Sequence, residues 1–192
     1  MNILDCSGLK CPIPVVNTKK YFDSIDEGEA TVIIDNEVAK NNVSKLCDSL
    51  GLYYEVEEKQ HKYYINVKKE KCQVCENISF EQDYGIVIGS NKMGQGEDKL
   101  GEILMKSYLF ALSEQDKIPK FLIFLNSGVK LTTEGSGVIE SLKALEEKDT
   151  EILSCGTCLD FYNIKDKLLI GDISNMYTIV EKMNSVKNTI KI

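Results

Sequence analysis

The sequence alternates between short apolar runs and longer segments with helical periodicity, and it does so in two separate series. The first series predicts the order strand, helix, strand, helix, strand, strand. Its six elements cover residues 2–5, 12–22, 30–34, 38–50, 53–57 and 63–67. One face of the second helix is apolar and is formed by Val38, Ala39, Val43, Leu46, Cys47 and Leu50. Because β-branched runs favour strands and Gly51 can end a helix, the N-terminal part is predicted to be a βαβαββ unit.

The second series begins at Gly85, and its strands alternate with helices. The predicted strands cover residues 86–88, 121–125, 152–155 and 189–192, and a glycine-containing loop covers 91–96. Three helical faces are marked by apolar residues, at Leu100, Ile103, Leu104 and Ala111, at Val138, Ile139, Leu142 and Leu145, and at Met176, Ile179, Val180 and Met183. This alternation predicts a mostly parallel sheet with helices on both faces. Sites in such sheets lie beyond the carboxyl ends of the strands.

A polar stretch without clear periodicity separates the two series. It contains Cys72-Gln73-Val74-Cys75 and is interpreted as a linker. The chain is therefore predicted to have a first domain at residues 1–70, a linker at 71–83 and a second domain at 84–192.

The composition disfavours several classes of protein. A formal net charge of −7 is untypical of a nucleic-acid binder and suits a protein that meets small molecules or other proteins. No apolar run is long enough to span a membrane, and the N-terminal segment lacks the basic and apolar regions of a secretory signal. We therefore expect a cytoplasmic protein that does not enter a membrane.

Cysteine is the unusual component, because the chain has seven cysteines, one histidine and no tryptophan. The cysteines are Cys6, Cys11, Cys47, Cys72, Cys75, Cys155 and Cys158. An odd number of cysteines without an export signal disfavours a disulfide framework. The sequence therefore favours redox, thiol-transfer or metal chemistry.

Cys11 directly precedes Pro12 and Pro14, which lie where a helix is predicted to begin. The N–H groups and the dipole of a helix start stabilise an anion, and Lys10 adds a positive charge, so both favour the thiolate. Gly8 allows the preceding loop to turn tightly. A thiolate in this position can accept a sulfane sulfur as a persulfide. The alternative is that Cys11 is a small buried apolar residue.

The segment from Asp5 to Pro14, with its CPxP sequence, resembles the signature of the SirA/TusA family of sulfur carriers. Asp35-Asn36-Glu37 and Asn41-Asn42-Val43 extend this resemblance, which covers roughly residues 1–70. The resemblance implies a two-layer α/β sandwich and a persulfide-carrying cysteine at Cys11. Lys10 stands where many relatives have arginine. The positive charge is kept, but the planar guanidinium with its paired N–H donors is lost.

Cys6 has two interpretations. It can resolve an oxidised or persulfidated Cys11 as a disulfide, or it can pack at the end of the first strand.

The second candidate site is Cys155-Gly156-Thr157-Cys158, which follows a predicted strand. The CxxC spacing is typical of dithiol redox motifs, and the alternative is a pair of small buried residues. This half of the chain resembles DsrE/DsrF-like sulfur-relay domains. The resemblance is carried by Gly85 to Ser90, Met93-Gly94, Asn126 to Val129 and Ile152 to Cys158. It implies a reactive cysteine at Cys155, leaves Cys158 as an additional thiol, and implies association into a homo-oligomer.

A SirA/TusA-like domain joined to a DsrE-like domain resembles the YedF family, whose members are described as sulfurtransferase-like proteins of selenium metabolism. This implies a carrier that holds a persulfide, or its selenium analogue, on Cys11. A cysteine-desulfurase-like donor and an acceptor protein are the implied partners, and no cofactor is expected. Two alternatives stay open: a redox-sensing regulatory or interaction module, and a structural zinc protein in which Cys72 and Cys75 join Cys155 and Cys158.

Overall fold

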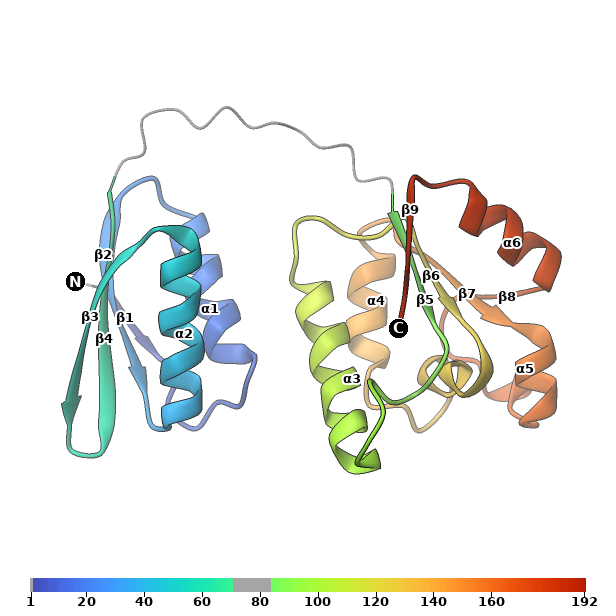
Figure 1. Ribbon diagram of the computed structural model, residues 1–192, viewed down its shortest axis with the longest axis horizontal. Coiled ribbons are helices and arrows are strands. Elements are labelled where there is room, and N and C mark those ends of the chain that lie inside the picture. The colour runs from blue at the N-terminus through green and yellow to red at the C-terminus, as the bar shows by residue number, and fades with distance from the viewer. Residues whose placement is uncertain (1, 71–83) are drawn as a thin grey trace. The chain divides into compact units, whose positions relative to one another are not determined.

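The computed structural model describes residues 2–70 and 84–192 (Figure 1). The chain divides into two compact units, one within residues 1–78 and the other within residues 79–192, and each is described by itself. The predicted linker, with Cys72 and Cys75, lies outside the described residues.

The first unit has the predicted βαβαββ order. Its elements are β1 (Asn2–Asp5), α1 (Ile13–Asp23), β2 (Gly28–Ile34), α2 (Glu37–Leu50), β3 (Tyr53–Lys59) and β4 (Lys62–Lys69). The strand order is β1-β2-β4-β3, with β1 parallel to β2 and the other pairs antiparallel. Both helices lie on one face of the sheet (Figure 1). The expected two-layer sandwich is therefore confirmed.

Local signals explain where α2 begins and ends. The Asn36 side chain accepts a hydrogen bond from the Ala39 N–H at 2.8 Å, and Gly51 ends the helix in the left-handed conformation at φ 64°. The buried face of α2 consists of Ala39, Val43 and Cys47. Val38 and Leu50, which the sequence placed on the apolar face, lie at its edges and are exposed.

The second unit contains a five-stranded sheet. Its regular elements are β5 (Tyr84–Ile88), α3 (Asp98–Ser113), β6 (Phe121–Phe124), η1 (Asn126–Thr132), α4 (Ile139–Glu146), β7 (Glu151–Cys155), α5 (Gly156–Phe161), η2 (Lys165–Lys167), β8 (Asp172–Ser174), α6 (Met176–Asn184) and β9 (Asn188–Lys191). The order is β8-β7-β6-β5-β9, and all pairs are parallel. Helices α3 and α4 lie on one side of the sheet and α6 on the other (Figure 1). This confirms the predicted parallel sheet with helices on both faces.

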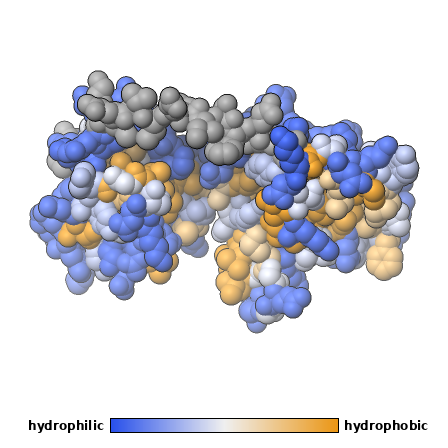
Figure 2. Space-filling model, turned by 45° about the horizontal axis from the view of Figure 1, so that its top comes forward, coloured by the Kyte–Doolittle hydropathy of each residue, from blue (hydrophilic) through white to orange (hydrophobic). Residues whose placement is uncertain are grey.

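The predicted face of α3 is wrong. Its buried residues are Gly101, Met105, Leu109 and Ser113, whereas Leu100, Ile103 and Leu104 are 53%, 61% and 42% exposed. The helix is turned by about one position because Gly101 packs against the loop at Lys92 and Met93, where a Cβ would lie 3.0 Å from the Lys92 Cβ. Apolar side chains left on the surface are seen as orange areas among hydrophilic ones (Figure 2).

The third predicted helical face is correct only in part. In α6, Ile179 is fully buried, while Met176 and Val180 are 55% and 47% exposed. The helices η1 and η2 and the strand β8 were not predicted, since they are short and lack a clear period. Within residues 2–70 and 84–192, no helix is both long enough and apolar enough to cross a membrane.

Candidate functional site

The loop between β1 and α1 presents Cys11 at the surface of the first unit. Cys11 is exposed and its thiol is free. Pro12 is the N-cap residue of α1, so Cys11 lies one position before the cap, and Pro14 is buried in the first turn. Lys10, directly before the cysteine, is exposed as well. The expectation that Cys11 precedes a proline-initiated helix is confirmed.

Two aspartates shape this loop. The Asp5 carboxylate accepts a hydrogen bond from the Ser7 N–H at 2.9 Å, and the Asp35 carboxylate accepts one from the Gly8 N–H at 2.6 Å. Gly8 has φ 75°, a left-handed conformation that glycine adopts without strain. Asp35 therefore ties the cysteine loop to the junction between β2 and α2.

Hydrogen bonds favour the ionised form of both aspartates. The Asn36 side chain and then the Gly8 N–H lower the pKa of Asp35 from its usual value of 3.8. Hydrogen bonds from Ser7 lower the pKa of Asp5 in the same way. The loop is consequently held by charge-assisted hydrogen bonds over the whole neutral range.

The Cys11 thiol has one polar neighbour from another element. The side-chain Nδ2 of Asn42, on α2, lies 3.5 Å from the Cys11 Sγ. An amide N–H in this position can donate to a thiolate or to a persulfide anion, and it can donate without changing its own charge. The arrangement therefore offers an accessible sulfur nucleophile with a fixed donor beside it.

Neither Asn42 nor Asp35 was singled out as a site residue from the sequence, although both lie in segments that carry the family resemblance. Asn42 is separated from Cys11 by 31 positions. A single sequence gives no signal for such a contact, because it depends on how α2 packs beside the α1 start.

Cys6 has a different environment from Cys11. It is fully buried, and its N–H donates to the Ile33 carbonyl at 2.9 Å. Burial raises the pKa of the Cys6 thiol, and the Asn17 side chain at 4.0 Å opposes this only in part. These features favour the packing interpretation of Cys6.

The second pair of thiols lies where β7 runs into α5. Cys155 is the last residue of β7 and the N-cap of α5, and Cys158 follows in the first turn. Cys155 is 2% exposed, whereas Cys158 is partly exposed, and both are free. Behind Cys155, the hydroxyls of Thr132 and Ser154 form a buried hydrogen bond of 2.8 Å. The CxxC sequence thus places one buried and one accessible thiol at the carboxyl end of β7.

Cys158 is held by the segment after β6. The Asn126 N–H donates to the Cys158 Sγ at 3.1 Å, and the Tyr162 hydroxyl donates to the Asn126 Oδ1 at 2.9 Å. A hollow of about 270 Å³ in front of the thiol is lined by Asn126, Thr157, Cys158, Phe161 and Tyr162. Burial is the largest influence and raises the pKa of Cys158, and the neighbouring Cys155 thiol acts in the same direction. Cys158 is therefore mainly a thiol at neutral pH.

No group of three His, Cys, Asp or Glu side chains within residues 2–70 and 84–192 is placed to hold a metal ion. The four-cysteine zinc hypothesis needs Cys72 and Cys75, which lie outside this part of the chain.

Two protein-family models match the sequence: Sulfurtransferase TusA at residues 2–69 and the DsrE/DsrF-like family at residues 105–192. The second match begins inside α3, so Gly85 to Ser90 lie before it. A provisionally named sulfur carrier protein of Methanocaldococcus jannaschii is 32% identical over 71 residues, which make up 36% of this chain and 95% of that protein.

Two solved structures are also similar. A SirA-like protein of Desulfitobacterium hafniense is 30% identical, with a TM-score of 0.35, over 36% of this chain and 100% of that one. The ychN protein from E. coli is 18% identical, with a TM-score of 0.45, over 58% of this chain and 99% of that one. By its two matching domains and its sulfur-carrier relative, the chain belongs to the TusA family of sulfur carriers and is a TusA/DsrE fusion of the YedF-like kind.

Proposed function

We propose that this protein carries sulfane sulfur as a persulfide on Cys11 and passes it to a partner protein. The observation that carries the proposal is the exposed Cys11 thiol at the start of α1, with the Asn42 Nδ2 3.5 Å from its sulfur. Membership of a sulfur-carrier family supports the same role. The cysteine is accessible to a macromolecular donor, and its loop is ordered in advance by Asp5 and Asp35.

The loading step is a thiol–persulfide exchange. The Cys11 thiolate attacks the terminal sulfur of a donor persulfide, a new S–S bond forms on Cys11, and the donor S–S bond breaks. The donor cysteine leaves as a thiolate, and the proton released from the Cys11 thiol balances its charge. The sulfane sulfur keeps its oxidation state, so no external oxidant or reductant is needed. Lys10 and Asn42 stabilise the persulfide anion by charge and by hydrogen bonding.

We propose that Cys155 and Cys158 form a second site, which accepts the sulfur from Cys11. Cys158 is the accessible member, and because burial raises the pKa of its thiol, only a minor thiolate fraction is nucleophilic at neutral pH. Attack by a Cys158 thiolate on the terminal sulfur of the Cys11 persulfide would move that sulfur to Cys158 and regenerate the Cys11 thiolate. Cys155 can then displace the sulfur as hydrosulfide, with formation of the Cys155–Cys158 disulfide.

The proposed partners are a cysteine-desulfurase-like donor and an acceptor protein. Selenium is a proposed alternative cargo, because a selenium atom on Cys11 would need the same anion stabilisation and the resemblance to YedF-like proteins points to selenium metabolism. The relative donor preference for sulfur and selenium is measured by loading the protein from cysteine or from selenocysteine.

Variants separate this function from simple thiol reactivity. The protein is incubated with a cysteine desulfurase and labelled cysteine, and sulfide released by dithiothreitol is quantified. Cys11→Ser should abolish the labelled sulfide that is recovered on the protein. Cys6→Ser is the matched control in the same unit and should keep it, because Cys6 is buried. Equal recovery from wild type and Cys11→Ser would refute the proposal.

A redox role is the second candidate, and the CxxC pair at the β7 end favours it. In that case Cys155 and Cys158 cycle between dithiol and disulfide without taking up sulfur. A redox titration with glutathione and a reversible disulfide in the absence of any transfer to a partner would support this role.

A further inference from the structure

The backbone of Asn126 has an uncommon conformation beside the second pair of thiols. Its φ of 48° lies in the left-handed region, which asparagine enters more readily than most residues with a side chain. The N–H of the same residue donates to the Cys158 Sγ at 3.1 Å. A hydrogen bond from an N–H group to a sulfur favours the negatively charged form of that sulfur. The conformation of Asn126 therefore affects the chemistry of Cys158 directly.

The residues on either side of Asn126 are fixed by the sheet. The Leu125 N–H donates to the Ile88 carbonyl of β5 at 2.9 Å, and the Gly128 N–H donates to the Leu125 carbonyl at 2.9 Å. Gly128 packs so closely on Ile88 that an added Cβ would lie 2.3 Å from the Ile88 carbonyl oxygen. The turn that carries the Asn126 N–H is therefore anchored at the carboxyl ends of β5 and β6.

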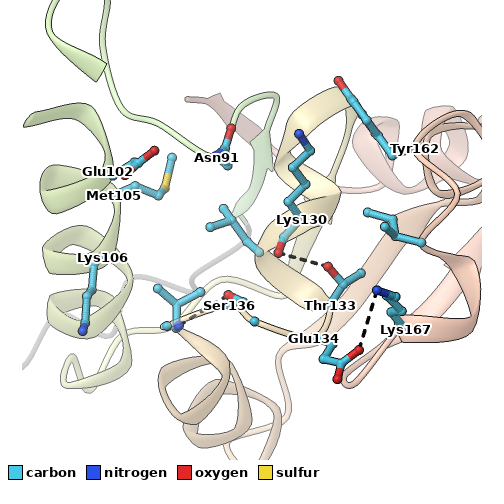
Figure 3. A pocket seen from close by; sticks show the side chains of 15 residues that line it. Asn91, Glu102, Met105, Lys106, Lys130, Thr133, Glu134, Ser136, Tyr162 and Lys167 are labelled. Carbon is cyan, nitrogen blue, oxygen red and sulfur yellow. Dashed lines mark hydrogen bonds and ion pairs between the residues drawn. The ribbon is translucent and has the colours of Figure 1, made fainter. Parts of the chain in front are cut away.

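Tyr162 holds the side chain of Asn126. Its hydroxyl donates to the Asn126 Oδ1 at 2.9 Å. The Lys130 Nζ lies 4.5 Å from the centroid of the Tyr162 ring, in a cation–π contact. Figure 3 shows the Lys130 side chain extending from η1 towards this ring. Lys130, Tyr162 and Asn126 thus form a chain of contacts that ends at the Cys158 sulfur.

The N–H donor lies at the accessible thiol of the pair. Cys155 is 2% exposed, whereas Cys158 is partly exposed and lines the same hollow as Asn126 and Tyr162. Burial raises the pKa of Cys158, and the Asn126 N–H acts against this increase. The N–H therefore offsets part of the cost of forming a thiolate at the sulfur that a partner protein can reach.

We propose that the Asn126 N–H stabilises the sulfur anion on Cys158, and that Tyr162 is the positioning residue that holds this N–H in place. The resemblance to DsrE/DsrF-like domains implies a reactive Cys155, whereas the donor lies at Cys158. The inference rests on the proposed role of the CxxC pair as the second site for sulfur. Its test uses the thiols alone, without a sulfur donor, so its failure is distinct from a failure of sulfur transfer.

The pH profile of Cys158 alkylation tests the role of Tyr162. The reduced full-length protein is labelled with iodoacetamide between about pH 7 and 11, and fragmentation of the labelled peptide separates Cys158 from Cys155. Tyr162→Phe keeps the ring and loses the hydrogen bond to Asn126. Because Asn126 is exposed and water competes there, the midpoint of the profile should rise by only about 0.3–0.7 pH unit.

A second tyrosine supplies the matched control. Tyr84→Phe also removes one tyrosine hydrogen bond, which the hydroxyl donates to the Lys117 carbonyl at 3.1 Å, at the first residue of β5. Its midpoint should equal that of wild type. Other ionisable groups in the region of Cys158 stay in place in Tyr162→Phe, and they are Cys155, Lys130, Asp160 and Lys165.

Asn126→Gly is a second variant with the same expected effect. Glycine keeps the N–H and adopts the left-handed conformation without strain, but it lacks the side chain that Tyr162 holds. The Tyr162 hydroxyl stays in this variant, so a rise that both variants share does not come from titration of the phenol. The double variant should show no larger rise than either single variant, because both substitutions remove the same hydrogen bond. A midpoint that does not rise in one or both single variants, or additive rises in the double variant, would overturn the proposal.

Discussion

Replacement of Asn42 by alanine tests the polar environment of Cys11. The Asn42 Nδ2 lies 3.5 Å from the Cys11 Sγ at an exposed site. Hydrogen bonds to ionised groups contribute about 1.5–3 kcal/mol, and water replaces much of this at the surface, so we assign ~0.5–1 kcal/mol to stabilisation of the thiolate. Since 1.4 kcal/mol corresponds to a factor of ten, and since a less stabilised thiolate is also a stronger nucleophile, Asn42→Ala should slow alkylation of Cys11 at pH 7 by about 1.5- to threefold.

The assay is the rate of iodoacetamide labelling at Cys11, measured by peptide mapping so that the other cysteines do not contribute. Asn41→Ala is the matched control, because Asn41 is the exposed neighbour on the same helix and the same substitution has the same effect on helix propensity. Equal labelling rates in wild type, Asn41→Ala and Asn42→Ala would refute the reasoning that Asn42 stabilises the sulfur anion.

Three further predictions concern Cys47, Gly128 and Cys158. Burial raises the pKa of Cys47 from 9.0 to about 11. The folded state therefore has its full stability from this thiol below pH 9, and the free energy of unfolding falls by about 2–3 kcal/mol as the pH rises towards 11. Urea unfolding should show a smaller loss in Cys47→Ala than in wild type, because Cys6, whose pKa burial also raises, is kept in both proteins, and identical pH dependences would contradict the prediction. Gly128→Ala should destabilise the second unit by about 1–3 kcal/mol, because its Cβ would lie 2.3 Å from the Ile88 carbonyl oxygen, whereas calorimetry of Gly137→Ala should show no change. Alkylation of Cys158 should continue to accelerate above pH 9, since burial raises its pKa, and a plateau below pH 9 would be inconsistent with that burial.

The order of elements was predictable because each strand and helix of the two series has its own local signal. In the first unit, the β-branched run of β2, the apolar face of α2 and Gly51 at its end predict these elements without tertiary information. The buried face of α3 was not predictable, because apolar residues occur on two sides of that helix. Packing of Gly101 against the Lys92–Met93 loop decides which side faces the core.

Some residues of the candidate site were likewise predictable from the sequence, and others were not. Cys11 was predictable from its place before two prolines, and the Cys155–Cys158 pair from its place after a strand. The Asn42 contact and the tie between Asp35 and Gly8 join residues 31 and 27 positions apart. Contacts of this kind arise from tertiary packing and have no local pattern.

The location of the added sulfur on the loaded protein tests the proposed carrier role of Cys11. The chain is incubated with a cysteine desulfurase and cysteine, its free thiols are blocked, and each cysteine-containing peptide is analysed by mass spectrometry. We expect one additional sulfur atom on the peptide that contains Cys11 and none on the peptides of the buried Cys6 and Cys47. Additional sulfur on other cysteines with Cys11 unmodified, or no additional sulfur on any peptide, would contradict the carrier role of Cys11.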